Sequence, residues 1–147
     1  MAAGIVELSR EEIDEFLHAQ VVGRIGVHAG GATYVVPVIY AYADDALHVY
    51  TVEGRKVAMM REEPQVCFEV DEYDADGRGS WRSVIVQGRY QELGGEDAER
   101  VLSLLAARFR RAAGGTGTAA RRPRGDGRPG VAFRIAIDSV TGRAVDR

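Results

Sequence analysis

The feature that most constrains the fold is a series of short segments in which apolar and polar residues alternate, each followed by residues that favour a turn. Alternation with a period of two places one set of side chains on one face of a strand, so these segments predict half-buried β-strands. Pairs such as Gly30-Gly31 and Asp44-Asp45 then end the strands. The chain is therefore expected to be mainly β, with tight turns between strands.

Six strands are predicted, over residues 21–28, 33–42, 47–52, 66–71, 80–93 and 131–137. The fifth strand has Gly88 in its interior, which indicates a bulge or a sharp bend. In a chain of 147 residues, six antiparallel strands favour a closed or nearly closed barrel, because closure removes exposed sheet edges.

Three helices are expected beside the strands. Ser9 and Glu12 have the spacing of a capping box, so a short amphipathic helix begins there and runs to about residue 20. A second helix is predicted over residues 55–62, and a third over residues 97–112, where apolar residues recur at helical spacing. Residues 113–130, rich in Gly, Ala, Arg and Pro, are expected to form a flexible loop before the last strand of a single domain, residues 1–147.

Composition excludes several classes of protein. The net charge is −3, and the basic residues concentrated in 108–147 have no interleaved aromatic residues, so no nucleic-acid partner is expected. No apolar run is long enough for a membrane helix and no signal-peptide pattern is present, so a cytoplasmic protein is expected. Cys67 is the single cysteine, and the three histidines lack metal-ligand spacing, so no metal site is predicted.

A candidate phosphate site follows the third strand. Eighteen of the 19 basic residues are arginine, and the one lysine, Lys56, stands beside Arg55 where the second helix begins after Gly54. Helix N-termini offer unpaired amides and a partial positive charge, to which phosphate binds readily. Arg55 would clamp the phosphate, Lys56 would add a compact charge and Thr51 a hydroxyl. The alternative is a solvated first turn in which both cations pair with neighbouring glutamates.

Two further segments have unusual strand faces. Pro37 in the second strand cannot donate to a sheet, so residues 34–40 indicate an edge or a bulge whose free backbone groups suit a flat heteroaromatic ring. The alternative is an ordinary edge strand. The fifth strand places Trp81, Ser83, Ile85 and Gln87 on one face, a mixture of aromatic, hydroxyl and amide groups. The alternative there is a tryptophan in the core.

Five motifs in this order carry a resemblance to a known family: Val22-Gly23-Arg24-Ile25-Gly26, Pro37-Val38-Ile39-Tyr40, Gly54-Arg55-Lys56, Trp81-Arg82-Ser83-Val84 with Gly88, and Thr141-Gly142-Arg143. Over about residues 7–142, the chain resembles the pyridoxamine 5′-phosphate oxidase-like, FMN-binding split-barrel superfamily. It is most similar to the small nitroimidazole-reductase-like branch. The resemblance implies a six-stranded antiparallel split barrel of Greek-key type with flanking helices.

The resemblance also implies a cofactor site. FMN would lie along the second and third strands, at the interface of a homodimer, with the second chain completing each site. The residues implied to contact it are Val35, Val36, Pro37, Val38, Ile39 and Tyr40 at the isoalloxazine, Tyr50 and Thr51 near the ribityl chain and phosphate, Arg55 and Lys56 at the phosphate, and Trp81, Arg82 and Ser83.

The activity implied is that of an FMN-dependent oxidoreductase. The flavin's own redox chemistry would reduce a small electron-poor substrate such as a nitro compound, and no dedicated catalytic acid or base is assigned. Two alternatives stay open. The deazaflavin F420 could replace FMN, with the Arg121-Arg122-Pro123-Arg124 segment supplying cations for its longer anionic tail. Alternatively, the barrel could bind flavin or haem without turnover.

Overall fold

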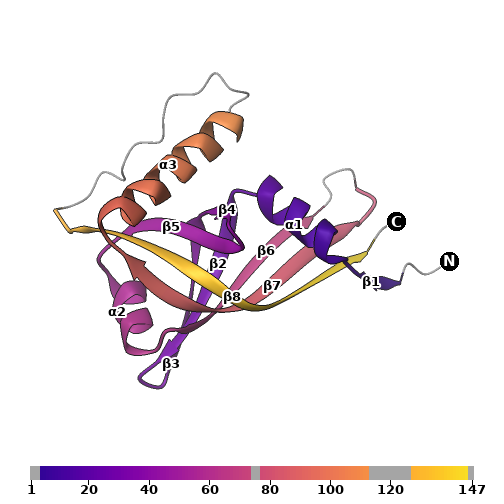
Figure 1. The fold of residues 1–147 in the computed structure, drawn as a ribbon. Helices are drawn as coiled ribbons and strands as arrows, with labels where there is room; N and C mark the ends of the chain where they lie inside the picture. Colours follow the sequence, from indigo (N-terminus) through magenta and orange to yellow (C-terminus); the bar gives the residue numbers. More distant parts are fainter. Residues whose placement is uncertain (1–3, 74–76, 113–126, 146–147) are drawn as a thin grey trace.

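A computed structural model describes residues 4–73, 77–112 and 127–145 (Figure 1). Its elements, in chain order, are β1 (Ile5–Glu7), α1 (Arg10–Ala19), β2 (Val22–Ala29), β3 (Ala32–Ile39), β4 (Ala41–Ala43), β5 (Ala46–Val52), α2 (Arg55–Glu62), β6 (Gln65–Tyr73), β7 (Trp81–Leu93), α3 (Gly95–Ala112) and β8 (Gly130–Val145).

All of these strands belong to one antiparallel sheet with the order β3-β2-β6-β7-β8-β5-β4, and β1 pairs with the end of β8. The path starts at β3 and ends at β4, which follow one another in the chain, and the sheet does not close between them. This is the architecture of a split barrel. The predicted fold class, a mainly β antiparallel barrel with three helices, is confirmed.

The described residues form eight strands where the sequence predicts six. The predicted strand 33–42 is divided at Tyr40, whose backbone N–H donates to the carbonyl of Val21 at 3.0 Å while β4 turns to pair with β5. The short β1 is the other addition. The last strand also extends well past its predicted end at Ile137, because its second half pairs with the first half of β7 and with β1.

Local signals place α1 and the bend in β7 as predicted. The Ser9 hydroxyl accepts from the Glu12 N–H at 3.2 Å and the Glu12 carboxylate accepts from the Ser9 N–H at 3.0 Å, which completes the capping box. The β7–β8 register shifts between Gln87 and Gly88. A Cβ on Gly88 would lie 2.5 Å from the carbonyl oxygen of Ala136, so only glycine fits at the bulge.

The interior of the barrel forms the main core, and the three helices cover different parts of it. Ile25, Leu47, Phe68, Phe133 and Ile135 are fully buried there. α1 adds Ile13, Phe16 and Leu17 to this core. α2 packs against β2, whereas α3 lies across β4, β5 and β8 and buries a second, smaller cluster (Figure 1). No helix within the described ranges is long and apolar enough to cross a membrane.

Candidate functional site

A groove of about 390 Å³ lies where β3, β5 and the start of α2 meet. Six of the residues predicted to form the site line it, together with Val22 of β2: Pro37, Val38, Ile39, Tyr50, Thr51 and Lys56. Residues far apart in the sequence therefore meet as the resemblance implies. The groove has an apolar wall from β3 and a cation at its α2 end.

The apolar wall depends on the position of β3 in the sheet. Among the described strands, β3 pairs only with β2 and ends the sheet path, as Pro37 predicts. Alternation then directs Pro37 and Ile39 outward, and Ile39 keeps 43% of its surface exposed. A large apolar side chain exposed beside a concave surface is typical of a binding site.

The other end of the groove is the N-terminus of α2. Gly54 occupies the N-cap position and makes no side-chain capping bond, so the first amides of α2 have no side-chain acceptor from the cap. Lys56 is partly buried beside them, and burial, followed by the charge of Arg128, lowers the pKa of its ammonium. An anion in the groove would offset this burial and accept hydrogen bonds from the helix amides.

Arg55 takes a different direction from Lys56. Its side chain is exposed, its guanidinium carbon lies 4.9 Å from the centre of the Tyr34 ring, and it does not line the groove. Glu53, a neighbouring glutamate, is held instead by Arg61 through contacts of 2.6 and 2.9 Å. Within the part of the chain that the structure describes, neither Arg55 nor Lys56 forms an ion pair.

The segment of residues 35–40 is divided between three environments. Pro37, Val38 and Ile39 reach the groove, whereas Val35 is exposed on the outer face of the sheet and Val36 packs against the core. Tyr40 is fully buried, and its hydroxyl donates to the carbonyl of Leu17 at 2.7 Å. Burial raises the pKa of this phenol. The structure therefore does not bring the side chain of Tyr40 to the groove.

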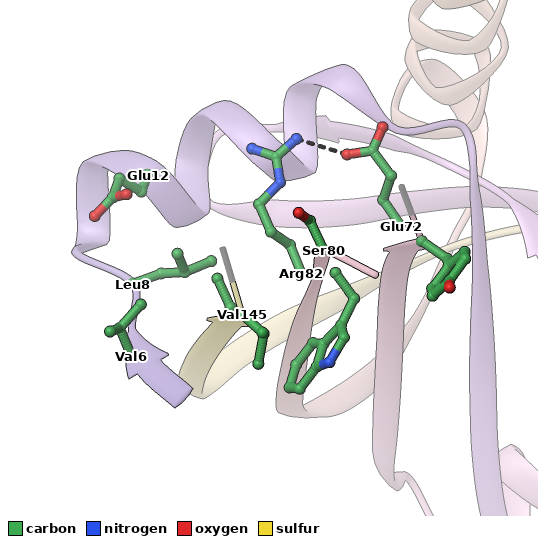
Figure 2. Close-up of a pocket in the computed structure, with 10 residues that line it drawn as sticks. Val6, Leu8, Glu12, Glu72, Ser80, Arg82 and Val145 are labelled. Carbon is green, nitrogen blue, oxygen red and sulfur yellow. Dashed lines mark hydrogen bonds and ion pairs between the residues drawn. The ribbon is translucent and has the colours of Figure 1, made fainter. Parts of the chain in front are cut away.

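Trp81 and Arg82 line a second pocket of about 630 Å³, at the end of the barrel where β1 lies (Figure 2). Arg82 donates to Glu72 at 2.6 Å, and its guanidinium carbon lies 5.0 Å from the centre of the Phe16 ring. Ser83 is partly buried on the same strand. Because α2 and β3 lie at the opposite end of the sheet (Figure 1), one chain alone does not bring Trp81, Arg82 and Ser83 to the groove.

The profile of the family described as pyridoxamine 5′-phosphate oxidase matches residues 9–144, which is nearly the whole chain. The chain belongs to this family. An uncharacterized protein from Rhizobium meliloti strain 1021 is 34% identical over 86 residues, which cover 58% of this chain and 56% of that protein. The match therefore spans about half the length of this curated relative.

Solved structures agree with membership of the pyridoxamine 5′-phosphate oxidase family. A FAD-binding protein from Mesorhizobium loti is 32% identical, with a TM-score of 0.77 over 99% of this chain and 100% of that one. A candidate 5-nitroimidazole antibiotic resistance protein from Bacteroides thetaiotaomicron has a TM-score of 0.76 over 98% of this chain and 89% of that one. It is 16% identical, so it shows a shared fold.

Two residues near the groove were not predicted from the sequence. Val22 lines it from β2, and its exposure depends on strand register that no local pattern reveals. Arg128 lies in the segment predicted to be a flexible loop, yet it donates to the carbonyl of Glu53 at 2.9 Å.

Residues 113–126 of the predicted flexible loop, with the arginines considered for F420, lie outside the described residues. The described residues contain no group of three potential ligands placed to hold a metal ion.

Proposed function

We propose that this member of the pyridoxamine 5′-phosphate oxidase family is a flavoprotein that binds FMN in the groove between β3 and β5. One observation supports the proposal most directly: the groove joins an apolar wall, Pro37 and Ile39, to a hydroxyl and a cation, Thr51 and Lys56. A flavin mononucleotide has the same two parts, a flat ring system and a terminal phosphate. The site therefore fits the group that the family implies.

The phosphate end fits for two further reasons. Lys56 is partly buried and has no carboxylate partner in the described part of the chain. The N-cap of α2 supplies no side-chain acceptor to the helix amides. A phosphate with a charge of about −1.5 to −2 would satisfy both groups at once. Neither group would gain as much from an uncharged ligand.

A bound flavin supplies hydride or electron transfer to an oxidised acceptor. Pro37, Val38 and Ile39 would keep water from one side of the ring, and Lys56 with Thr51 would hold the phosphate and so fix the ring's position along β3. The proposed activity is that of an oxidoreductase acting on a small electron-poor substrate. Nitro compounds are the first class to test, because the Bacteroides thetaiotaomicron protein that shares the fold is described as a candidate 5-nitroimidazole antibiotic resistance protein.

We also propose that the active form is a homodimer. Val22, Val35, Ile39 and Ile85 are between 43% and 61% exposed on the described sheet, a large apolar area for a monomer. A second chain covering this face would bury these side chains. The resemblance implies that the second chain completes each site, and we propose that it does so by placing its own Trp81, Arg82 and Ser83 near the first chain's groove.

FAD is the second candidate cofactor, because the Mesorhizobium loti protein that is 32% identical is described as FAD-binding. The visible spectrum and chromatographic mobility of the cofactor released from freshly purified protein distinguish FMN, FAD, F420 and haem.

Titration of the apoprotein with FMN and riboflavin then tests the phosphate site. Since a hydrogen bond to a charged group contributes about 1.5–3 kcal/mol, FMN should bind at least about tenfold more tightly. Equal affinities would remove the phosphate site, and a deazaflavin or haem spectrum would overturn the proposal.

A further inference from the structure

A cluster of three charged side chains lies on the outer face of the sheet, where β2 pairs with β6. Arg24 of β2 lies directly opposite Glu69 of β6, and Asp71 follows two residues later on the same face. Nη1 of Arg24 donates to Glu69 at 3.1 Å and to Asp71 at 2.9 Å. One guanidinium therefore serves two carboxylates, and both contacts use the same nitrogen.

The two carboxylates of the cluster differ in accessibility. The side chain of Glu69 is 32% exposed and that of Asp71 is 44% exposed. Burial and the neighbouring Asp71 raise the pKa of the Glu69 carboxyl, whereas Arg24 lowers it. Among the described residues, Nε and Nη2 of Arg24 donate to no carboxylate. Asp71 and one edge of the guanidinium are therefore the parts of the cluster most open to a further partner.

Exposed apolar side chains surround the cluster on the same face. Val22 lies two residues before Arg24 on β2 and pairs with Ile39 of β3, and Ile85 of β7 pairs with Glu69. Residues directly opposite one another in antiparallel strands share a face of the sheet. All three apolar side chains are exposed, whereas α3 covers the sheet elsewhere, at β4, β5 and β8 (Figure 1). A partner that covers these apolar side chains therefore also covers the charged cluster.

The charges of this face suit a second copy of the same face. Charged groups that lose water on being covered need opposite charges and hydrogen bonds in its place. In an isologous interface, a residue of one chain contacts a second residue of the other chain, and the reverse contact occurs as well. Because the cluster presents both signs of charge side by side, Arg24 and Asp71 can pair twice across a two-fold axis.

Arg143 offsets the second negative charge of the cluster. It lies on β8 and pairs with Ser83 of β7, which in turn pairs with Asp71, so all three residues share the outer face. Arg143 is exposed. The cluster and Arg143 together comprise two arginines and two carboxylates, so a second copy covers a set of charges that sums to zero.

We infer that a second copy of the chain docks on this outer face, with Arg24 of each chain bound to Asp71 of the partner subunit. The inference rests on the proposed function, because it names the residues that join the two chains of the proposed homodimer. The free edge of each planar guanidinium takes the carboxylate of the partner subunit, while Glu69 stays bound to Arg24 within its own chain. The apolar side chains around the cluster are then buried between the two sheets.

The test uses two charge reversals, R24E and D71R, and measures assembly by sedimentation velocity. Each variant alone brings like charges together at both contacts, so each should sediment as a monomer. An equimolar mixture of the two variants should form a dimer, because one contact then joins the two reversed charges and the other joins the two unchanged ones. Native mass spectrometry should show that this dimer contains one chain of each variant. A pairing that exists only within one chain does not predict this rescue.

Milder substitutions and a matched control accompany the reversals. R24Q and D71N keep the size of the side chain and remove its charge, and each should weaken the dimer about tenfold. R10E is the matched control, because Arg10 also joins two carboxylates, Asp14 and Asp45, but lies on α1. This variant should sediment as the wild type does. Circular dichroism checks that every variant is folded.

Several results would overturn the inference. Folded R24E and D71R could remain dimers, or R24Q and D71N could leave the dimer unchanged, which would place the interface on another face. The mixture of R24E and D71R could stay monomeric, which would confine the pairing to one chain. A wild-type monomer would assign the face to a different partner.

The cofactor proposal fails separately. A wild-type dimer that shows rescue in the mixture but binds no FMN would support the inference and remove the flavin from the proposed function. A wild-type protein that binds FMN as a monomer would keep the flavin and overturn both the proposed homodimer and the inference that rests on it.

Discussion

The bend in β7 depends on one glycine, which makes it a sensitive point for stability. At Gly88 a Cβ would meet the backbone oxygen of Ala136 at 2.5 Å and a methyl of Ile135 at 2.6 Å, and neither the backbone nor the buried Ile135 can move freely. Gly88→Ala should cost about 1–3 kcal/mol of unfolding free energy, as overpacking does. Gly26→Ala is the control, because its Cβ would have no neighbour closer than 3.8 Å. A thermal melt should show a drop of several degrees for the first variant alone; equal melting temperatures would contradict the argument.

Some structurally important residues can be recognised from the sequence and others cannot. Gly88 is recognisable because glycine inside a long strand is locally unusual. Gly130 carries no such signal, although a Cβ there would lie 1.8 Å from the hydroxyl of Tyr50. Arg128 is likewise one arginine of many until the fold brings it to Glu53. Positions defined by contact with a distant segment are therefore the ones that the sequence does not reveal.

At the scale of elements, the side chain of Arg108 joins α3 to the end of α1. Arg108 is 9% exposed and donates to the carbonyl oxygens of Ala19 and Gln20 at 2.5 and 3.3 Å, where α1 leaves acceptors unsatisfied. Arg108→Ala should therefore destabilise the protein by about 1–3 kcal/mol, measured by urea unfolding. Arg110→Ala, on the exposed face of the same helix, should change stability by less than about 0.5 kcal/mol. Equal effects would show that the contact between α3 and α1 contributes little.

Helix α3 also lies near His48 of β5. The burial of this imidazole makes the free energy of unfolding depend on pH. His48 is 4% exposed; its Nε2 lies 3.1 Å from the carbonyl of Ala43, and its Nδ1 has no hydrogen-bond partner. Burial is the main cause that lowers the pKa of His48, and the charges of Arg100 and Arg134 lower it further. The contact with the Ala43 carbonyl and the charge of Asp44 raise the pKa, but by less. The unfolded chain therefore takes up the proton first, so unfolding free energy should fall as pH decreases below about 6.5.

Urea unfolding at about pH 7.5 and about pH 5.5 measures this dependence. His48→Gln keeps a neutral donor for Ala43 and should reduce the loss of stability on acidification. His28→Gln is the matched control, because His28 is exposed and contacts the Thr33 hydroxyl at 2.8 Å. If His48→Gln lost as much unfolding free energy on acidification as the wild type does, the pH dependence would belong to other groups.

Elements with local signals were predicted well, and elements defined by pairing were not. The capping box located α1, and the bounds of α2 are those expected from Gly54 and Pro64. The division of β3 from β4 depends on the bond from Tyr40 to Val21, and the second half of β8 depends on pairing with β1 and β7. Both are long-range interactions, and neither leaves a periodic pattern in the residues concerned.

At the scale of the whole molecule, the predicted site is divided between two ends of one barrel. Lys56 and Ile39 line the groove beside α2, whereas Trp81 and Arg82 line the pocket beside β1. Sequence order and resemblance place these residues in one site, and a single chain keeps them apart. The proposed homodimer would reconcile the two, and it would make cofactor binding and assembly interdependent.

If the proposed FMN site lies in the proposed homodimer interface, FMN should strengthen the dimer, because a ligand stabilises the state that binds it. Ile85 is 43% exposed on β7 and pairs across the sheet with Glu69, so Ile85→Arg adds a charge to the outer face while gaining an opposite charge beside it. The variant should fold, sediment as a monomer and bind FMN at least about tenfold more weakly. Ile5→Arg, at a 61% exposed position on β1, is the control and should sediment as the wild type does. Sedimentation velocity with and without FMN measures both effects, and a monomer that holds FMN tightly would place the whole site within one chain.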